Sequence, residues 1–331
     1  MTSTHAPEKT SSLNTTCTLT VSVHQMRVES DGVLSLELVH PHGDTLPAWT
    51  PGAHIDIDLG AGLLRQYSLC GDPADPSSYR IGVLREPSSR GGSIQIHDVV
   101  RPGQEVRISE PRNNFELSDS TTPLIFIAGG IGITPILAMA RQAEQQGREF
   151  TLHYGGRSRR NMAFLRELEV FGDKVSLYSD DREGPLALDE ILQDAHTGGH
   201  EVYVCGPGGL LDEVERRSQD WPKNTFHCER FVPKVIEAPA DGEREFLVAC
   251  SESGVTVNIP ADVSILESLE NAGIAVPNSC REGTCGSCET TVLSGLPDHR
   301  DSLLSSEEQE SGETMLLCVS RCKSDLLELE I

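Results

Sequence analysis

The chain has 331 residues and a mass of 36.0 kDa. A chain of this length is too long for a single hydrophobic core, so two or three domains are predicted. A hydrophobic share of 37% with mixed charge is typical of a soluble globular protein and excludes the disordered and fibrous classes. The formal net charge of −24 argues against a nucleic-acid partner, whose phosphates need Lys and Arg, and against a membrane-binding surface.

Residues 1–18 are predicted to form a disordered tail, because "MTSTHAPEKTSSLNTT" contains no apolar run. The same stretch lacks the apolar segment of a secretory signal, so a cytoplasmic location is expected. In that reducing compartment disulfides are rare, and the ten cysteines favour metal or redox roles.

Residues 19–121 are predicted to form an antiparallel β-barrel or sandwich. Apolar and polar residues alternate in short runs, which Gly, Pro and Asp interrupt at regular intervals. The runs are "CTLTVSVHQM", "GVLSLELVH", "AHIDIDLG", "RQYSLCG", "YRIGVLRE", "GSIQIHDVV" and "QEVRISEP".

Residues 122–232 alternate apolar strands with helical stretches, which indicates a doubly wound α/β unit with a parallel sheet. The first segment, "PLIFIAGGIGITPILAMA" (123–140), is uncharged and long enough to be considered as a membrane span. Gly129, Gly130, Gly132 and Pro135 interrupt it, so a strand, a turn and a helix are favoured instead. The remaining strands are "EFTLHYGG", "KVSLYSD" and "EVYVCGP", and the helices include "NMAFLRELEVFG", "LALDEILQDA" and "LLDEVERRSQ".

A charged, Pro-containing linker is predicted at residues 233–242, followed by a small α+β unit at 243–331. That unit begins with a hairpin that turns at Ser253-Gly254. A short helix follows, for which Ser264 and Glu267 have capping-box spacing and Gly273 provides the stop. After it come a cysteine-rich loop and two more short strands.

Cys280, Cys285 and Cys288 follow the spacing C-x4-C-x2-C, and 29 residues separate Cys288 from the fourth cysteine, Cys318. This is the plant-type 2Fe–2S pattern, which differs from the paired C-x2-C knuckles of zinc sites. The small residues between the cysteines let backbone N–H groups approach sulfur. A zinc site and a disulfide pair are the alternatives, and the compartment makes the disulfide the weaker one.

Two strand-to-helix turns are candidate anion sites, because exposed N–H groups and the helix dipole meet there. The first contains Gly129, Gly130 and Gly132, and the second is Cys205-Gly206-Pro207. A ligand that lies across the carboxyl ends of parallel strands would touch both turns. A plain packed turn, with Cys205 as a small buried hydrophobic residue, is the alternative.

In the barrel region, "RQYS" (65–68) and "SSRGGS" (88–93) combine groups that suit a planar, phosphate-bearing ligand. Arg65 offers a bidentate fork for phosphate, Tyr67 a flat face and Ser68 a hydroxyl. The glycine turn allows backbone donors to come close to a phosphate. Taken one at a time, these residues also fit a surface arginine, a core tyrosine and an ordinary turn.

The motifs "RQYS", "SRGGS", "GGIGITP", "CGP" and "CREGTCGSC" occur in the order seen in the phthalate dioxygenase reductase family, which includes vanillate demethylase reductases. The resemblance covers the chain after about Leu19. It implies an FMN-binding barrel, an NADH-binding domain and a C-terminal plant-type ferredoxin (β-grasp) domain. Members that resemble this chain are NADH-dependent iron–sulfur flavoproteins that pass electrons to a separate terminal oxygenase of the Rieske type, which acts on an aromatic or similar small substrate.

The resemblance also implies roles for individual residues. Ser68, Thr134 and Cys205 would lie at the reacting flavin and nicotinamide rings, and Phe231 would close the flavin from the domain junction. Arg230 departs from the small residue that the family commonly has there. FMN would be held by Arg65, Gln66, Tyr67, Ser68, Gly82, Val83, Leu84, Arg90, Gly91, Gly92 and Ser93, NADH by Gly129, Gly130, Gly132, Thr134, Asp180, Cys205, Gly206 and Pro207, and the 2Fe–2S cluster by Cys280, Cys285, Cys288 and Cys318.

The choice between NADH and NADPH depends on two charged segments. Asp180 and Asp181 would bind ribose hydroxyls and repel a 2′-phosphate, which favours NADH. The basic stretch Arg157 to Arg160 could hold that phosphate instead.

Two alternative functions remain at this point: a reductase for a haem-thiolate monooxygenase, and a non-catalytic iron–sulfur redox sensor or carrier. The last segment, from Glu243 to Ile331, has 17 acidic and 5 basic residues. We therefore expect its partner protein to present a basic surface.

Overall fold

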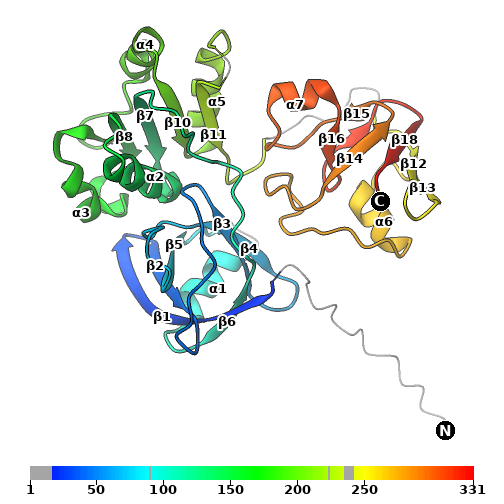
Figure 1. The fold of residues 1–331 in the computed structure, drawn as a ribbon, viewed down its shortest axis with the longest axis horizontal. Coiled ribbons are helices and arrows are strands. Elements are labelled where there is room, and N and C mark those ends of the chain that lie inside the picture. Colours follow the sequence, from blue (N-terminus) through cyan, green and yellow to red (C-terminus); the bar gives the residue numbers. More distant parts are fainter. Residues whose placement is uncertain (1–16, 89–90, 223, 235–241) are drawn as a thin grey trace.

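The computed structural model describes residues 17–88, 91–222, 224–234 and 242–331, which form three units, each built around its own β-sheet. The first unit (the barrel) contains β1 to β6, the second (the parallel-sheet unit) β7 to β11, and the third (the C-terminal unit) β12 to β18. Figure 1 shows them as three lobes that meet near the middle of the molecule. The predicted fold class is confirmed, whereas most of the predicted tail and linker lies outside the described residues.

The barrel is a six-stranded sheet in the order β4-β3-β6-β1-β2-β5, and all neighbouring strands are antiparallel. A bridge between Leu69 and Ile81 joins the two outer strands and closes the sheet on itself. Alternate apolar side chains point inward and form one core. The strands are β1 (Leu19–Ser30), β2 (Val33–Val39), β3 (His54–Asp58), β4 (Leu64–Ser68), β5 (Ser78–Leu84) and β6 (Glu105–Ile108).

One predicted strand of this region, "GSIQIHDVV", is wrong: it forms the helix α1 (Gly92–Asp98). Ile94 and Ile96 alternate as in a strand, but the buried side chains are Ser93, Ile96 and Val100, three and four residues apart. That spacing is helical. A run this short cannot be assigned by periodicity alone.

The parallel-sheet unit has the strand order β11-β10-β7-β8-β9, with all pairs parallel. Helices α2 and α3 pack on one face and α4 and α5 on the other, which gives the predicted doubly wound arrangement. The strands are β7 (Leu124–Gly129), β8 (Phe150–Gly156), β9 (Val175–Ser179), β10 (Glu201–Cys205) and β11 (Phe226–Glu229), and the helices are α2 (Ile133–Gln145), α3 (Leu165–Leu168), α4 (Leu188–Gly198) and α5 (Gly208–Arg217).

The uncharged segment 123–140 folds as the strand β7, a 3₁₀ turn η1 (Gly130–Gly132) and the helix α2, as predicted. In the described part of the chain, no helix has both the length and the apolar character needed to cross a membrane.

The predicted helix "NMAFLRELEVFG" is only partly helical. Phe164 has a left-handed backbone (φ 61°), so the α-helical part is α3 alone. The 3₁₀ segments η2 (Arg159–Asn161) and η3 (Glu169–Lys174) flank it. Strand β11, which follows the last helix, was not predicted.

The C-terminal unit has the strand order β13-β12-β18-β14-β16 and a second pair, β15-β17. The hairpin turns at Ser253-Gly254 as predicted, and Gly254 has φ 69°. Ser264 caps α6 by accepting a hydrogen bond from the Glu267 N–H, and Gly273 (φ 82°) ends it. The elements are β12 (Phe246–Cys250), β13 (Val255–Ile259), α6 (Ile265–Asn271), β14 (Glu289–Ser294), β15 (Pro297–Asp298), α7 (Ser306–Ser311), β16 (Thr314–Leu316), β17 (Arg321–Cys322) and β18 (Leu326–Leu329).

The prediction of two strands after the cysteines is therefore wrong, because the structure has five. Three of them have two or three residues, too few to show any alternation. Helix α7 was missed because "SEEQES" has no apolar face.

Candidate functional site

The predicted "RQYS" motif occupies β4 and faces the helix α1 that replaces the expected strand. Arg65 packs so closely on Gly92 that a Cβ at Gly92 would lie 2.4 Å from the arginine Cγ. Gly91, the residue before α1, has φ 93°, which favours glycine. Arg65, Gly91 and Gly92 therefore meet, as the resemblance implies for a phosphate site. Arg90 lies outside the described residues.

Helix α1 is held in front of β4 by contacts at both sides. The Gln95 side chain donates to the Leu59 carbonyl at 2.6 Å, and the His97 ring lies 2.9 Å from the Val83 carbonyl. The Ser93 hydroxyl accepts a hydrogen bond from the Glu86 N–H at 3.1 Å. The turn at 91–93 is thus fixed relative to both β4 and β5.

Two side chains of β4 suit a ring-shaped polar ligand. The Gln66 amide nitrogen is buried and has no hydrogen-bond partner in the described part of the chain. A buried donor of this kind needs an acceptor, such as a carbonyl oxygen of a flavin. Burial raises the pKa of the neighbouring Tyr67 phenol, so this ring remains neutral. The residues present here fit FMN.

The barrel meets the parallel-sheet unit at Gly82. A Cβ at Gly82 would lie 2.8 Å from the Thr134 methyl group and 3.1 Å from the Phe164 ring. Thr134 is buried at the start of α2, and its hydroxyl donates to the Ile131 carbonyl at 2.9 Å. The structure therefore brings β5, with Val83 and Leu84, against the turn that was predicted to bind the dinucleotide.

The two predicted anion turns pack directly on each other. A Cβ at Gly132 would lie 2.3 Å from the Cys205 carbonyl oxygen, and one at Gly129 would lie 2.6 Å from the Pro207 ring. Gly206 is equally confined, since a Cβ there would lie 3.0 Å from the Gly129 backbone. Around Gly130 there is open space. The glycines thus allow the ends of two strands to meet beside the open space at Gly130, which a ligand can enter.

Cys205 is fully buried at the end of β10, and burial raises the pKa of its thiol well above the ordinary value. Its register partner on β11 is Glu229. Burial raises the pKa of Glu229 to about 8, and its carboxyl oxygen Oε2 has no hydrogen-bond partner among the described residues. At neutral pH this carboxyl is protonated and can donate a hydrogen bond.

Sequence reasoning missed Glu229. "HCERF" contains nothing that distinguishes it from the other glutamates, since its position depends on β11, which was also missed.

The charged segments that bear on NADH or NADPH have different surroundings. Asp180 follows β9, is exposed, and donates its N–H to the Gly156 carbonyl at 3.0 Å. Arg159 pairs with Glu183 at 2.8 Å, and Arg160 pairs with Asp31 at 3.0 Å. Two of the basic groups that could hold a 2′-phosphate are therefore already neutralised within the chain.

Phe231 follows β11 and is 39% exposed, so its ring is available to a ligand. Arg230 before it points away into the parallel-sheet unit. Its guanidinium is buried and pairs with Asp212 at 2.7 Å and Glu215 at 2.8 Å. The unusual residue at this position thus anchors the chain to α5.

The four predicted ligand cysteines come together in the C-terminal unit, and all are buried. Hydrogen bonds from Cys285 and Cys318 lower the pKa of the Cys280 thiol, and a hydrogen bond with Cys318 lowers the pKa of the Cys288 thiol. Backbone N–H groups also point at sulfur: those of Glu282 and Ser287 lie 3.3 Å from Cys280 Sγ and 3.4 Å from Cys285 Sγ. Such N–H donors suit anionic cluster sulfurs.

No three His, Cys, Asp or Glu side chains within the described ranges converge closely enough to hold a single metal ion.

The cysteine loop (residues 280–288) lies against the barrel. The Asn114 side chain donates a hydrogen bond to the Cys285 carbonyl at 3.1 Å. On the barrel side His54 is buried, and burial together with the Arg112 charge lowers its pKa to about 4, while nearby Cys280 acts in the opposite direction. His54 pairs in register with Ser68, so the buried residue near Cys280 lies on the strand next to the one that carries a residue predicted at the flavin.

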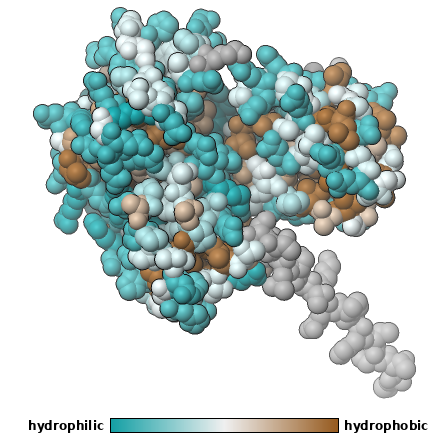
Figure 2. Space-filling view, viewed as in Figure 1, coloured by the Kyte–Doolittle hydropathy of each residue, from teal (hydrophilic) through white to brown (hydrophobic). Residues whose placement is uncertain are grey.

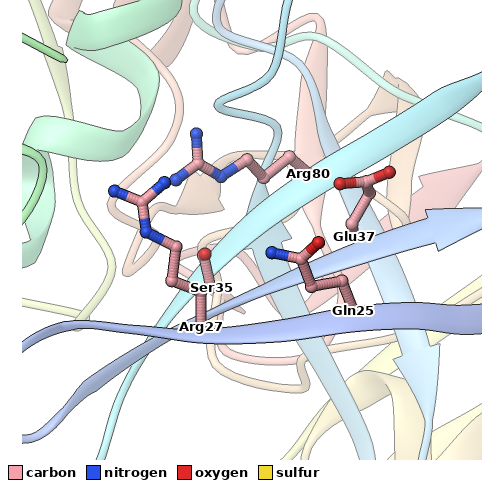
Figure 3. A pocket seen from close by; sticks show the side chains of 5 residues that line it. All are labelled: Gln25, Arg27, Ser35, Glu37 and Arg80. Carbon is pink, nitrogen blue, oxygen red and sulfur yellow. The ribbon is translucent and has the colours of Figure 1, made fainter. Parts of the chain in front are cut away.

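Two small cavities border the strand β1. One, of about 110 Å³, is on the outside of the barrel (Figure 3) and is lined by Gln25, Arg27, Ser35, Glu37 and Arg80. A larger one, of about 360 Å³, is bounded by β1 and the segment around α3. Arg80 belongs to the junction, since it pairs with Glu29 and Glu167 at 2.7 Å each.

Two family models match parts of this chain. The family model described as "2Fe-2S iron-sulfur cluster binding domain" matches residues 248–323, and "Oxidoreductase NAD-binding domain" matches residues 126–216. The first of these ranges contains all four predicted ligand cysteines.

Two curated relatives match nearly the whole chain. Phenoxybenzoate dioxygenase subunit beta of Ectopseudomonas oleovorans is 43% identical over 314 residues, which cover 95% of this chain and 97% of that protein. Vanillate O-demethylase oxidoreductase of Pseudomonas sp. (strain HR199 / DSM 7063) is 40% identical, with coverage of 94% and 99%.

Two solved structures are also similar. Phthalate dioxygenase reductase, described as a modular structure for electron transfer from pyridine nucleotides to [2Fe–2S], matches with a TM-score of 0.69 at 37% identity, covering 95% of this chain and 98% of that one. An intact type IV self-sufficient cytochrome P450 monooxygenase matches with a TM-score of 0.88 at 40% identity, covering 95% of this chain. This chain spans 41% of that protein's length.

These matches exceed what a shared fold requires, because they extend over all three units at about 40% identity. The chain belongs to the family of oxidoreductases that includes phthalate dioxygenase reductase and vanillate O-demethylase oxidoreductase, the reductase components of multicomponent oxygenase systems.

Proposed function

We propose that this chain accepts electrons from NADH and delivers them to a separate terminal oxygenase of the Rieske type, which acts on an aromatic or similar small substrate. FMN would accept hydride from NADH, and the 2Fe–2S cluster would pass electrons on singly, so the cofactors supply the redox chemistry and the protein positions them. We assign FMN to residues 19–121, NADH to 122–232 and the cluster to 243–331.

The observation that carries this proposal is the contact between Gly82 and Thr134. There the strand proposed to face the flavin packs its glycine against the Thr134 methyl group, which follows the turn proposed to hold the dinucleotide. A hydride donor and acceptor must approach closely, and a missing Cβ at position 82 keeps that approach open.

On the flavin side, the proposed roles follow from the positions of the residues. Arg65 with Gly91, Gly92 and Ser93 would hold the phosphate, and the Gln66 amide would donate to the ring system. Tyr67 would stack on the ring, and Ser68 would place a hydroxyl at its reacting edge. Gly82, Val83 and Leu84 would offer backbone groups to the ring edge.

On the nicotinamide side, the Gly129–Gly132 turn and Gly206-Pro207 would receive the dinucleotide, and Cys205 would border its ring. We add Glu229 to this set, because a buried neutral carboxyl beside Cys205 can donate a hydrogen bond to a carboxamide oxygen. Phe231 would cover the flavin. The ion pairs of Arg159 and Arg160, together with exposed Asp180, support NADH over NADPH.

The surface of the C-terminal unit supports the proposal that a partner protein docks there. Figure 2 shows apolar residues gathered on this lobe, and Leu247, Leu293, Leu296 and Leu326 are each more than 40% exposed. The same unit has 17 acidic and 5 basic residues. An apolar centre among charged side chains is the usual composition of a transient interface.

A haem-thiolate monooxygenase is the second candidate partner, because a self-sufficient cytochrome P450 monooxygenase contains a region that matches this chain. Supplying the purified chain and NADH to a Rieske oxygenase and, separately, to a haem-thiolate monooxygenase distinguishes them. We expect substrate turnover with the Rieske protein, whereas turnover with the haem protein alone would overturn that choice.

The modular function is tested with Cys285→Ser. We expect this variant to lose reduction of one-electron protein acceptors such as cytochrome c and to keep reduction of its flavin by NADH. Cys322→Ser is the matched control. Cys322 is buried and only four residues after the predicted ligand Cys318, but its sulfur is hydrogen-bonded to the Ser324 hydroxyl. Loss of both activities in Cys285→Ser, with an intact fold, would contradict separate flavin and cluster modules.

A further inference from the structure

Four consecutive residues, Arg112 to Phe115, contact all three units of the molecule. Arg112 extends the barrel: its backbone exchanges hydrogen bonds with His54 at 2.8 and 3.0 Å. Its guanidinium pairs at 2.8 Å with Asp56, which is fully buried. This end of the segment is therefore part of the rigid sheet.

Asn113 and Phe115 fix the segment on its other sides. The Asn113 side chain donates to Thr50 and to the Pro51 carbonyl at 2.8 and 2.9 Å, and accepts from the Phe115 N–H at 3.0 Å. The Phe115 ring is buried in the parallel-sheet unit, 5.7 Å from the ring of Tyr203. The backbone of Asn114 is thus fixed in place by the contacts of Asn113 and Phe115 on either side of it.

Asn114 is the member that reaches the cysteine loop. Its Nδ2 donates to the Cys285 carbonyl at 3.1 Å, and a Cβ at Gly286 would lie 3.4 Å from the same nitrogen. Cys285 is itself a predicted cluster ligand, and Gly286 lies between it and the predicted ligand Cys288. The C-terminal unit is also joined to the rest by the Lys234 N–H, which donates to Ser302 Oγ at 2.8 Å. That second contact belongs to the connection between the units.

We propose that Asn114 is a positioning residue, which holds the cysteine loop against the face of the barrel where the flavin is proposed to bind. The register supports this: Ser68 pairs with His54, and His54 pairs with Arg112, two residues from Asn114. The inference rests on the proposed function. It assigns to Asn114 the docking of one module on another and no contact with a reacting atom.

Units within one chain move relative to each other unless a specific contact holds them. Removing the Asn114 amide leaves the Cys285 carbonyl without its donor and lets the loop separate from the barrel. Because the bond lies between modules, it should not affect how NADH reaches the flavin, which depends on Gly82 and Thr134.

The test compares Asn114→Ala and Asn114→Asp with the wild type, using the full chain with its cofactors. Asp keeps the shape of Asn but replaces the donor with an oxygen that repels a carbonyl. Asn258→Ala is the matched control, because Asn258 is exposed in the same C-terminal unit and bonds only weakly, at 3.4 Å, to Glu245. Hydrogen exchange of residues 280–288 and the rates of flavin and cluster reduction after mixing with NADH are measured.

We expect cluster reduction to slow about fivefold in Asn114→Ala. The variant loses one neutral hydrogen bond, and a factor of ten corresponds to about 1.4 kcal/mol. Asn114→Asp should slow it at least as much. In both variants exchange in the loop should increase, and flavin reduction should keep its wild-type rate. Asn258→Ala should match the wild type in every measurement.

Unchanged cluster reduction and unchanged exchange in both variants would overturn the proposal. So would a loss of flavin reduction in the same proportion, since it would make Asn114 a general structural residue. A wild-type chain whose flavin NADH does not reduce would instead contradict the proposed function, so the two failures are distinguishable.

Discussion

At the scale of single residues, the most informative group is Glu229. Burial disfavours the charged form of its carboxyl and raises the pKa to about 8 from an ordinary 4.5, and the oxygen Oε2 has no hydrogen-bond partner among the described residues. Nothing in the letters "HCERF" indicates this. The carboxyl becomes notable only when β11 places it next to Cys205.

The raised pKa predicts how stability depends on pH. Between pH 4.5 and 8 the folded chain keeps this proton and the unfolded chain loses it, so stability falls as pH rises through that window. Glu229→Gln mimics the protonated form. It should match the wild type at pH 5 and be more stable at pH 9, by an amount on the order of 2–5 kcal/mol.

Urea unfolding at the two pH values measures this difference. Exposed Glu252→Gln is the control and should show no pH-dependent gain. An equal effect of Glu229→Gln at pH 5 and pH 9 would contradict a protonated carboxyl in the folded chain.

At the scale of elements, the two strand-to-helix turns depend on each other. Gly132 has an ordinary helical backbone (φ −61°), so its need for glycine comes from space: a Cβ would lie 2.3 Å from the Cys205 carbonyl oxygen. Gly132→Ala should therefore push the turns apart and lower stability by about 1–3 kcal/mol. The distorted turn should also weaken NADH binding.

Gly208→Ala is the matched control, because nothing lies within 4 Å of a Cβ there and the position is helical. It should be neutral or slightly stabilising, by up to about 1 kcal/mol. Thermal unfolding and NADH titration of both variants check this pair. If Gly132→Ala unfolds at the wild-type temperature, the two turns do not pack as described.

Elements with a clear period were predictable, and short or polar ones were not. The barrel strands and the α/β alternation follow from apolar patterns that extend over many residues. Helix α1 was misassigned because two isoleucines two apart fit both a strand and a helix. Strands β15 and β17, of two residues each, exist only through their tertiary pairing.

The candidate site shows the same division. The cysteines, the glycine turns and "RQYS" have distinctive spacing or composition, so sequence alone indicated them. His54, Asn114 and Glu229 do not, because each matters through a neighbour from another strand or another unit. Such residues become visible only when the units are placed together.

At the scale of the whole molecule, charge is concentrated on the C-terminal unit, with 17 acidic and 5 basic residues. If the C-terminal unit docks on a basic surface of the oxygenase, added salt should weaken the binding between the two proteins. Raising ionic strength from about 0.01 M to about 1 M shortens the screening length from about 30 Å to about 3 Å. The apparent KM for the oxygenase should then rise.

Steady-state turnover at saturating NADH measures that KM. NADH oxidation with dioxygen as the acceptor is the control, because this acceptor is small and uncharged, and its rate should change far less. A KM that does not depend on salt would argue against electrostatic docking of the C-terminal unit.

The central claim is that one chain joins a hydride-accepting module to a one-electron module. It is tested most directly by mixing the cofactor-loaded protein with NADH without oxygen, following flavin absorbance and the cluster's electron paramagnetic resonance signal together. The account predicts that flavin absorbance falls first and the reduced-cluster signal follows. A flavin that NADH leaves oxidised, or a cluster signal that appears before the flavin changes, would contradict it.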